Sequence, residues 1–391
     1  MPQPPHTPAG ALPEVTPEEA ARRDALAKLI LAEIDAGGGV VSFARFMELA
    51  LYAPGLGYYT GGKHKFGAAG DFVTATELGT VFARCLARQC AQILKTVGGN
   101  LLEAGAGRGR LAAELLLELE RLGQLPERYF ILELSSELRA VQAQTLHRHA
   151  PRLATRVVWL ERLPPIGFRG IVLGNELLDA MPVERFRMRA DGIARLGVGA
   201  EGGRFVWCEM KAGRELRERA SRLELAPDYE SEIGLVAEGW VRSVADILEQ
   251  GVLLLIDYGF PRAEFYHPDR RGGTLMCHYR HRAHTDPLTH VGLQDITAHV
   301  DFTAIARAGV EAGLDLLGYT SQAMFLIGCG LDEIVAALPE GDTRARLAIT
   351  NEIKKLTLPQ EMGELFKAIA LGRGIDIALR GFALQNRRER L

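Results

Sequence analysis

The chain has 391 residues, of which 47% are apolar and 24% charged, which is typical of a globular protein with a sizeable core. A formal net charge of −3 gives no reason to expect the basic face that nucleic acid binding uses, so we expect no nucleic acid partner. Five cysteines without a C-x-x-C pair argue against a disulfide framework or a zinc knuckle and favour a reducing, cytoplasmic location. The longest aliphatic run, 252–256, is far too short to span a membrane.

The N-terminal part is predicted to be a proline-rich disordered tail over 1–15, followed by a helical region with lid loops over 16–77. Thr16 followed by Pro17 is a typical helix start. A long loop rich in glycine and aromatic residues is more often functional than filler. The elements expected here are a helix from Thr16, a helix over 43–54, the glycine-rich loop over 55–72 and a helix over 77–97.

Strands and helices then alternate, which predicts a parallel sheet covered by helices. We therefore predict one doubly wound α/β domain over 78–335, with an inserted α/β subdomain at about 184–250 and a helical region over 336–391. The expected strands cover 100–104, 129–134, 157–160, 170–175, 251–260 and 314–320, with antiparallel strands in 184–210. The expected helices cover 111–122, 136–149, two charged segments up to 250, and 301–312.

The first predicted strand runs into a glycine loop that precedes a helix, a geometry that presents backbone N–H groups to a ligand. The dinucleotide fingerprint G-x-G-x-x-G fails, because Arg110 stands where the third glycine belongs. The pattern acid-x-G-x-G-x-G fits Glu103, Gly105, Gly107 and Gly109, and resembles the first motif of class I methyltransferases, which bind S-adenosylmethionine. The alternative is a tight turn in which glycine only supplies positive φ.

The chemistry of that cofactor agrees with two carboxylates in this region. A carboxylate at the end of the first strand, Glu103, suits a ligand that carries an ammonium and a sulfonium. Glu133 ends the second strand, where a carboxylate can accept both ribose hydroxyls. The combined pattern favours S-adenosylmethionine over a nicotinamide cofactor.

A second cluster follows the strand at 170–175 and consists of Asn175, Glu176 and Asp179. If a helical turn begins here, Glu176 and Asp179 are i, i+3 neighbours on one face. Two carboxylates suit a guanidinium, whose planar fork of donors matches them. The alternative is an acidic helix start that complements the helix dipole.

The histidines at positions 278, 281 and 284 have an H-x-x-H-x-x-H spacing. Neither a helix nor a strand would make the three converge, so we expect no metal and place His281 in a basic loop near the anionic end of a substrate. Asp301 is expected to cap a helix. His299 is either a general base or, more simply, a structural histidine.

At this point the sequence resembles the MidA-like methyltransferases, a family that includes a mitochondrial complex I assembly factor of eukaryotes. The segments that carry the resemblance follow the family's order over nearly the whole chain. They are 43–60, 66–77, 101–111 (LLEAGAGRGRL), 174–186 (GNELLDAMPVERF), 291–302 and 362–374.

The resemblance implies a class I methyltransferase fold, S-adenosylmethionine as cofactor and symmetric dimethylation of an arginine on a protein such as a complex I subunit. It implies cofactor contacts at Glu103, Gly105, Ala106, Gly107, Glu133, Leu134 and Asn175, and acceptor contacts at Glu176 and Asp179. Lid and substrate positions are Tyr59, Asp71, Thr74, Glu77 and His281. Ala53 and Thr76 replace the histidine and proline usual in the family, and both flank the lid.

Three other functions stay open from the residues alone: a small-molecule methyltransferase, a cofactor-binding assembly factor without turnover, and a nicotinamide-dependent oxidoreductase, which Arg110 disfavours. The expected partner is an arginine-containing protein, and a homodimer is also an expectation.

Overall fold

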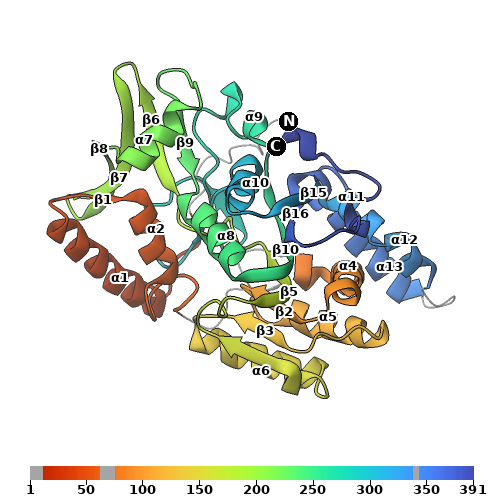
Figure 1. Ribbon diagram of the computed structural model, residues 1–391. Helices are drawn as coiled ribbons and strands as arrows, with labels where there is room; N and C mark the ends of the chain where they lie inside the picture. Colours follow the sequence, from red (N-terminus) through yellow and green to blue (C-terminus); the bar gives the residue numbers. More distant parts are fainter. Residues whose placement is uncertain (1–11, 62–74, 338–342) are drawn as a thin grey trace. The chain divides into compact units, whose positions relative to one another are not determined.

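The computed structural model describes residues 12–61, 75–337 and 343–391, which form two compact units (Figure 1). The large unit contains the described residues of Thr74–Leu178, Glu238–Arg262 and Phe302–Leu391. The small unit contains those of Met1–Val73, Asp179–Ala237 and Ala263–Asp301. Both units are therefore interleaved along the chain, whereas the sequence predicted contiguous regions with a single insertion.

The large unit is built on a sheet with the strand order β15-β16-β10-β5-β2-β3-β4. Neighbouring strands from β10 to β4 pair in parallel, and β16 pairs antiparallel with both β10 and β15. This order is that of a doubly wound, Rossmann-like class I methyltransferase sheet. The strands are β2 (Asn100–Ala104), β3 (Tyr129–Leu132), β4 (Val157–Leu160), β5 (Phe168–Asn175), β10 (Leu248–Phe260), β15 (Asp315–Ser321) and β16 (Phe366–Arg373).

The prediction of a helical C-terminal region is wrong for β16, which lies inside the sheet. Its residues are buried along almost the whole strand, so no alternation of polar and apolar residues marks it. A short apolar run of this kind cannot be assigned to helix or strand from periodicity, and its alanines favour a helix.

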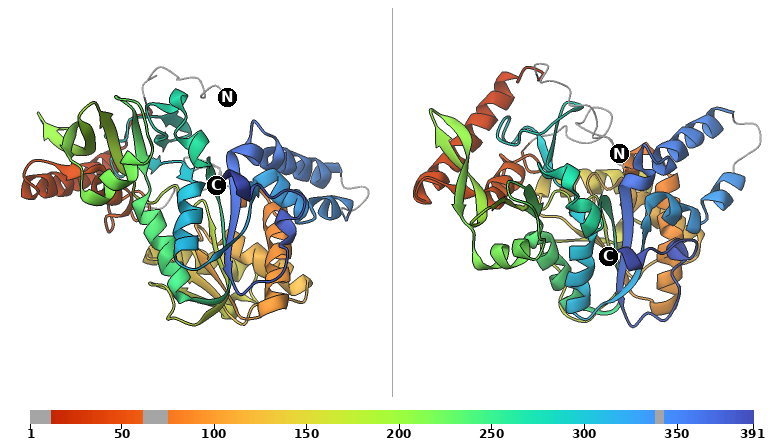
Figure 2. Two further views of the ribbon diagram at one scale, coloured as in Figure 1. Left: turned by 45° about the horizontal axis from the view of Figure 1, so that its top comes forward. Right: turned by 90° about the horizontal axis from the view of Figure 1, so that it is seen from above.

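Helices cover both faces of this sheet, as the side chains of β10 show. Val252, Leu254 and Ile256 belong to the buried cluster that includes α4 and α5, while the alternate residues Leu253 and Leu255 point to the opposite face. Figure 2 shows α10, in cyan, on one side of the sheet and α4, in orange, on the other. The helices of this unit include α3 (Ala75–Leu78), α4 (Val81–Val97), α5 (Arg110–Arg121), α6 (Ser136–His149), α10 (Phe302–Glu311), α11 (Gln322–Gly328), α12 (Leu331–Ala336), α13 (Thr343–Thr357) and α14 (Met362–Leu365).

The single helix predicted over 77–97 is interrupted, because α3 ends at Leu78 and α4 begins at Val81. Glu352 of α13 stabilises the interruption, because its Oε1 accepts a hydrogen bond from the N–H of Val81 at 2.7 Å. A Cβ on Gly79 would overlap the Glu352 carboxylate. A residue from the far end of the chain thus caps α4 where Thr80 makes no side-chain cap.

The small unit contains α1 (Pro17–Ala36), whose predicted start is confirmed by a capping box between Thr16 and Glu19. Its main sheet has the order β1-β7-β6-β9, with β8 also paired to β7, and a second sheet has the order β12-β11-β13. The remaining elements are β1 (Val41–Ser42), α2 (Phe43–Tyr52), β6 (Glu184–Arg189), β7 (Gly192–Glu201), β8 (Arg204–Lys211), α7 (Arg214–Ser221), β9 (Glu230–Ile233), β11 (Met276–Tyr279), β12 (Arg282–His284), β13 (Asp295–Thr297) and β14 (Val300–Asp301). Helices α8 (Leu235–Ile247) and α9 (Arg262–Phe265) include residues of both units.

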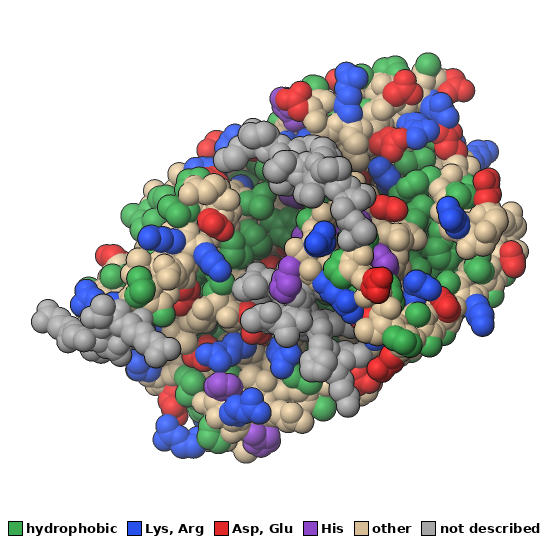
Figure 3. All heavy atoms as spheres, turned by 180° about the vertical axis from the view of Figure 1, so that it is seen from behind, with side chains coloured by type: hydrophobic (Ala, Val, Ile, Leu, Met, Phe, Trp, Pro, Cys, Tyr) green, Lys and Arg blue, Asp and Glu red, His purple; other side chains and the backbone are tan. Residues whose placement is uncertain are grey.

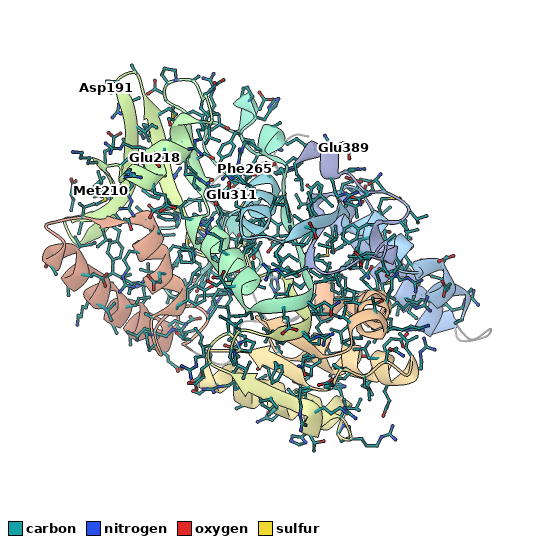
Figure 4. The ribbon with its side chains drawn as sticks, in the orientation of Figure 1. Asp191, Met210, Glu218, Phe265, Glu311 and Glu389 are labelled. Atoms are coloured by element: carbon teal, nitrogen blue, oxygen red, sulfur yellow. The ribbon has the colours of Figure 1, made fainter. Side chains whose placement is uncertain are left out.

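The antiparallel strands predicted within 184–210 are confirmed as β6, β7 and β8. Asp191 lies in the turn that joins β6 to β7, and Met210 lies near the end of β8 (Figure 4). The prediction of two consecutive helices up to residue 250 missed β9, which lies between α7 and α8. Four residues paired at a sheet edge give too short a pattern to be read from the sequence.

Charged side chains on these strands pair with one another. Glu209 accepts from Arg187 at 2.7 Å and from Arg189 at 2.6 Å, and Arg185 pairs with Glu230 at 3.1 Å. On the face drawn in Figure 3, basic and acidic side chains of the described residues are interspersed. None of the helices in the described part of the chain has both the length and the apolar composition to cross a membrane.

Candidate functional site

The glycine loop follows β2 at the carboxyl end of the parallel strands, as predicted. Gly105, Gly107 and Gly109 all have positive φ, at 70°, 50° and 80°, so the loop uses glycine at each alternate position. A Cβ on Gly107 would meet no atom within 4 Å, so this position is open. Ala106 is buried and Gly109 is the N-cap of α5. The loop therefore presents its backbone at the open position of Gly107, while the flanking residues Ala106 and Gly109 are packed into the fold.

Glu103 is buried in β2, with 2% of its surface exposed. Its Oε2 accepts a hydrogen bond from the Tyr129 hydroxyl at 2.6 Å. Burial raises the pKa of Glu103 from 4.5 to about 7, and the hydrogen bond from Tyr129 opposes this rise. A carboxyl group with this pKa changes its charge easily when a cation binds nearby.

Glu133 directly follows β3, one residue beyond the end of the strand. Its Oε1 accepts from the N–H of Ser135 at 2.9 Å, and its Oε2 accepts from Nε2 of Gln142 at 3.1 Å. Burial raises its pKa. The next residue, Leu134, leaves 74% of its surface exposed, beside the half-buried Glu133.

Asn175 is the last residue of β5 and Glu176 follows it, and the structure brings their side chains together. Glu176 Oε1 accepts from Asn175 Nδ2 at 3.1 Å and from the N–H of Ala75 at 3.2 Å. The predicted helical turn is wrong: Glu176 has a φ of 48°, in the left-handed region. Glu176 and Asp179 are therefore not i, i+3 neighbours on a helix. The chain leaves the sheet immediately after Asn175 and turns sharply at Glu176.

Asp257 is a residue of this site that the sequence analysis missed. It lies on β10, beside the end of β5, and has 1% of its surface exposed. Its Oδ2 accepts from the N–H groups of Leu177 at 3.0 Å and Leu178 at 2.8 Å. The signal was present in the sequence, since Asp257 follows a run of buried aliphatic residues at the same edge of the sheet as Glu103.

Asp179 belongs to the small unit, where it is buried. Its carbonyl oxygen accepts from the N–H of Ala298 at 3.0 Å, and the next carbonyl, that of Ala180, accepts from the Tyr52 hydroxyl at 2.9 Å. Tyr52 stacks on Tyr59, with ring centroids 5.4 Å apart. The 179–180 segment is thus anchored to α2 and to the loop after β13.

Tyr59 donates a hydrogen bond from its hydroxyl to Asp295 Oδ1 at 2.9 Å, within the small unit. Burial and the nearby Asp295 raise the pKa of Tyr59 well above 10. Of the other predicted lid residues, Glu77 lies in α3, while Asp71 and Thr74 lie outside the described residues.

His281 is exposed in the two-residue turn between β11 and β12. Arg280 and His281 have φ values of 47° and 62°, as a tight hairpin turn requires. The backbone N–H of His299 donates a hydrogen bond to Thr274 Oγ1 at 3.1 Å, so His299 has a structural contact. Within the described ranges, His, Cys, Asp and Glu side chains form no group of three that could hold a metal ion.

The sheet order, the antiparallel β16 and the glycine loop at the carboxyl edge define a class I methyltransferase. A family model described as S-adenosyl-L-methionine-dependent methyltransferase matches residues 85–320. The chain belongs to this family, the MidA-like S-adenosylmethionine-dependent methyltransferases, and S-adenosylmethionine is its cofactor.

Three relatives illustrate the relationship. A crystal structure from Burkholderia thailandensis, bound to S-adenosyl-homocysteine, has a TM-score of 0.94 and 48% sequence identity, and covers 97% of this chain and 100% of its own. The mitochondrial protein arginine methyltransferase NDUFAF7 homolog of Drosophila melanogaster is 28% identical, over 93% of this chain and 88% of its own length. Protein arginine methyltransferase NDUFAF7 of Rattus norvegicus is 28% identical, over 85% and 81%.

Proposed function

We propose that the protein is a protein arginine N-methyltransferase that forms symmetric dimethylarginine, with a subunit of respiratory complex I as the type of acceptor. The names of the relatives in Drosophila melanogaster and Rattus norvegicus support the arginine acceptor. The observation that carries the proposal in this chain is the Glu176 carboxylate, held in a left-handed turn at the carboxyl end of β5.

The residues of the large unit fit the cofactor. Asn175 Oδ1 is buried and makes no hydrogen bond to any residue that the structure describes, so it is a ready acceptor. Glu133 would accept the ribose hydroxyls, Leu134 would cover an apolar face, and Glu103 would balance positive charge. The full proposed set is Glu103, Gly105, Ala106, Gly107, Glu133, Leu134 and Asn175.

When bound, the cofactor supplies an electrophilic methyl group on a sulfonium. Glu176 and Asp179 would accept charge-assisted hydrogen bonds from the acceptor guanidinium and turn one nitrogen towards the methyl group. One of the two carboxylates would take the proton that this nitrogen releases, so that charge stays balanced as the C–N bond forms and the C–S bond breaks. Tyr59, Asp71, Thr74, Glu77 and His281 are proposed to line the acceptor and exclude water.

The proposal is tested by mass spectrometry of proteins from a strain that lacks this gene, after incubation with the purified enzyme and heavy-methyl S-adenosylmethionine. We expect heavy dimethylarginine on one protein. The absence of heavy methyl from every protein would contradict an acceptor that is methylated in its mature form.

Two valine variants provide the matched control. Gly107 and Gly123 both have positive φ, at 50° and 67°, and neither Cβ would meet an atom within 4 Å. The strain of a side chain is thus similar at both positions, but only Gly107 lies in the cofactor loop. We expect Gly107→Val to abolish methyl transfer and Gly123→Val to retain it.

The acceptor clamp is tested by Glu176→Gln and Asp179→Asn. Each change keeps the shape of the side chain and removes its charge, so we expect kcat to fall about 100-fold with the cofactor Kd within about twofold. Full methyl transfer by Glu176→Gln with unchanged acceptor affinity would rule out the clamp.

A homodimer in the cytoplasm completes the proposal. Light scattering of the purified protein measures the oligomeric state, and a monomer would contradict the homodimer. Fractionation of the cells measures the location, and a membrane-associated protein would contradict the cytoplasm.

A further inference from the structure

Gln142 of α6 connects two parts of the cofactor site that are distant in sequence. The side chain is fully buried, and its Nε2 donates to the carbonyl oxygen of Gly107 at 2.9 Å and to Oε2 of Glu133 at 3.1 Å. The two N–H groups of one amide thus join the glycine loop to the carboxylate that follows β3. Neither contact is predictable from the sequence, because Gln142 lies on a predicted helix of mixed composition.

Trp159 of β4 determines which way this amide points. Its Nε1–H, which can only donate, lies 2.9 Å from Gln142 Oε1. The amide oxygen must therefore face Trp159, and both amide hydrogens must face Gly107 and Glu133. All three polar groups of the amide–indole pair are satisfied in this orientation, and a rotated amide would place two donors against each other.

Gly109 leaves the space that Gln142 occupies. A Cβ on Gly109 would lie 3.0 Å from Gln142 Cα and 3.2 Å from its Cβ, closer than ordinary packing allows. The third glycine of the motif thus lets α6 approach the loop, in addition to supplying a φ of 80°.

We infer that Gln142, oriented by Trp159, is a positioning residue for the cofactor: it fixes the Glu133 carboxylate and the Gly107 carbonyl relative to each other. This inference rests on the proposed role of Glu133 in binding the ribose. Gln142 acts through both Glu133 and the glycine loop. The part that passes through Glu133 disappears when the Glu133 charge is removed, whereas the part that passes through the Gly107 carbonyl stays.

The test is isothermal titration calorimetry of the full-length protein with S-adenosyl-homocysteine. Gln142→Leu removes all three hydrogen bonds of the amide, the two that it donates and the one that it accepts from Trp159, and we expect the Kd to rise about 10- to 100-fold. Trp159→Phe keeps an aromatic ring and removes the indole N–H, so we expect a smaller rise of about three- to tenfold. Trp159→Phe leaves Gln142 in place and therefore keeps the inference testable if Gln142→Leu does not fold.

A double-mutant cycle with Glu133→Gln separates positioning from general packing. We expect Gln142→Leu to weaken binding by a smaller factor in the Glu133→Gln background than in the wild type, because only the contact with the Gly107 carbonyl is left to lose. Equal losses in both backgrounds, or a Gln142→Leu protein with wild-type Kd, would overturn the inference. If Glu133→Gln itself leaves the Kd unchanged, the proposed role of Glu133 fails, and any loss in Gln142→Leu then has another cause.

Gly109→Ala and Gly123→Ala form the matched pair for packing. Both glycines have positive φ, at 80° and 67°, but only a Cβ at Gly109 meets Gln142. We expect Gly109→Ala to weaken S-adenosyl-homocysteine binding about tenfold and Gly123→Ala to leave it unchanged. Equal effects of the two substitutions would mean that backbone strain, and not displacement of Gln142, weakens the site.

Discussion

The buried carboxyl group of Glu103 makes the stability of the cofactor-free protein depend on pH. Its pKa is about 7 in the folded protein, because burial disfavours the charged form, and 4.5 is its ordinary value. At pH values between 4.5 and about 7, Glu103 has lost its proton in the unfolded chain but keeps it in the folded protein. The stability that Glu103 contributes is therefore complete below 4.5 and is lost as the pH rises through 7.

The size of this loss follows from the distance between the two pKa values, 4.5 and about 7, which corresponds to about 3 kcal/mol of unfolding free energy. Glu103→Gln removes the titration and keeps an oxygen that can accept from the Tyr129 hydroxyl. We therefore expect the unfolding free energy of Glu103→Gln minus that of the wild type to increase by about 2.5 kcal/mol between about pH 5 and about pH 8.

Urea unfolding of both cofactor-free proteins across this pH range measures the difference, and all other titrating groups cancel. Tyr129→Phe gives an independent check. It removes a hydrogen bond that favours the charged form of Glu103, so its stability should continue to fall at higher pH than that of the wild type. A difference between Glu103→Gln and wild type that stays constant with pH would refute the reasoning.

Two further changes test contacts that hold the site in place. The Asp257 carboxylate accepts from the N–H groups of Leu177, Leu178 and Tyr258, whereas Asp257→Asn leaves a single oxygen that can accept. Hydrogen exchange at the Leu177 amide should therefore speed up about tenfold or more, and unchanged exchange would contradict the anchoring. Gly79→Ala should displace the Glu352 carboxylate from the start of α4 and lower the unfolding free energy by about 1–2 kcal/mol. In a Glu352→Ala protein, which already lacks this cap, Gly79→Ala should lower the unfolding free energy little further. If thermal or urea unfolding shows that the losses of the two substitutions add, Gly79 does not act by leaving room for the Glu352 cap.

The parallel half of the fold was predictable because its pattern is local. Buried strands alternate with amphipathic helices from β2 to β5, so the predicted strands and helices agree with the structure to within about two residues. The glycine loop and Glu133 were predictable for the same reason, since a strand end and a helix start frame them. The cofactor followed from this motif, and the family followed from it together with five other segments spread along the chain.

The parts that were not predicted depend on contacts between distant segments. The sharp turn at Glu176 is held by Asp257, which is 81 residues away along the chain and cannot be paired with it from sequence alone. The same holds for Gln142, whose importance comes from the carbonyl and the carboxylate it meets. Strand β16 is recognisable only from its place between β10 and β15.

The position of β16 has a consequence for synthesis of the protein on the ribosome. Residues 100–175, which carry the glycine loop and Glu133, emerge early, but β10 and β15 meet only through residues 366–373. Until those residues leave the exit tunnel, β10 and β15 each have an unpaired edge, and the long aliphatic run of β10 is of the kind on which chains aggregate. A nascent chain therefore holds the cofactor loop on an unfinished sheet, and a chain that stops before β16 leaves the facing edges of β10 and β15 unpaired.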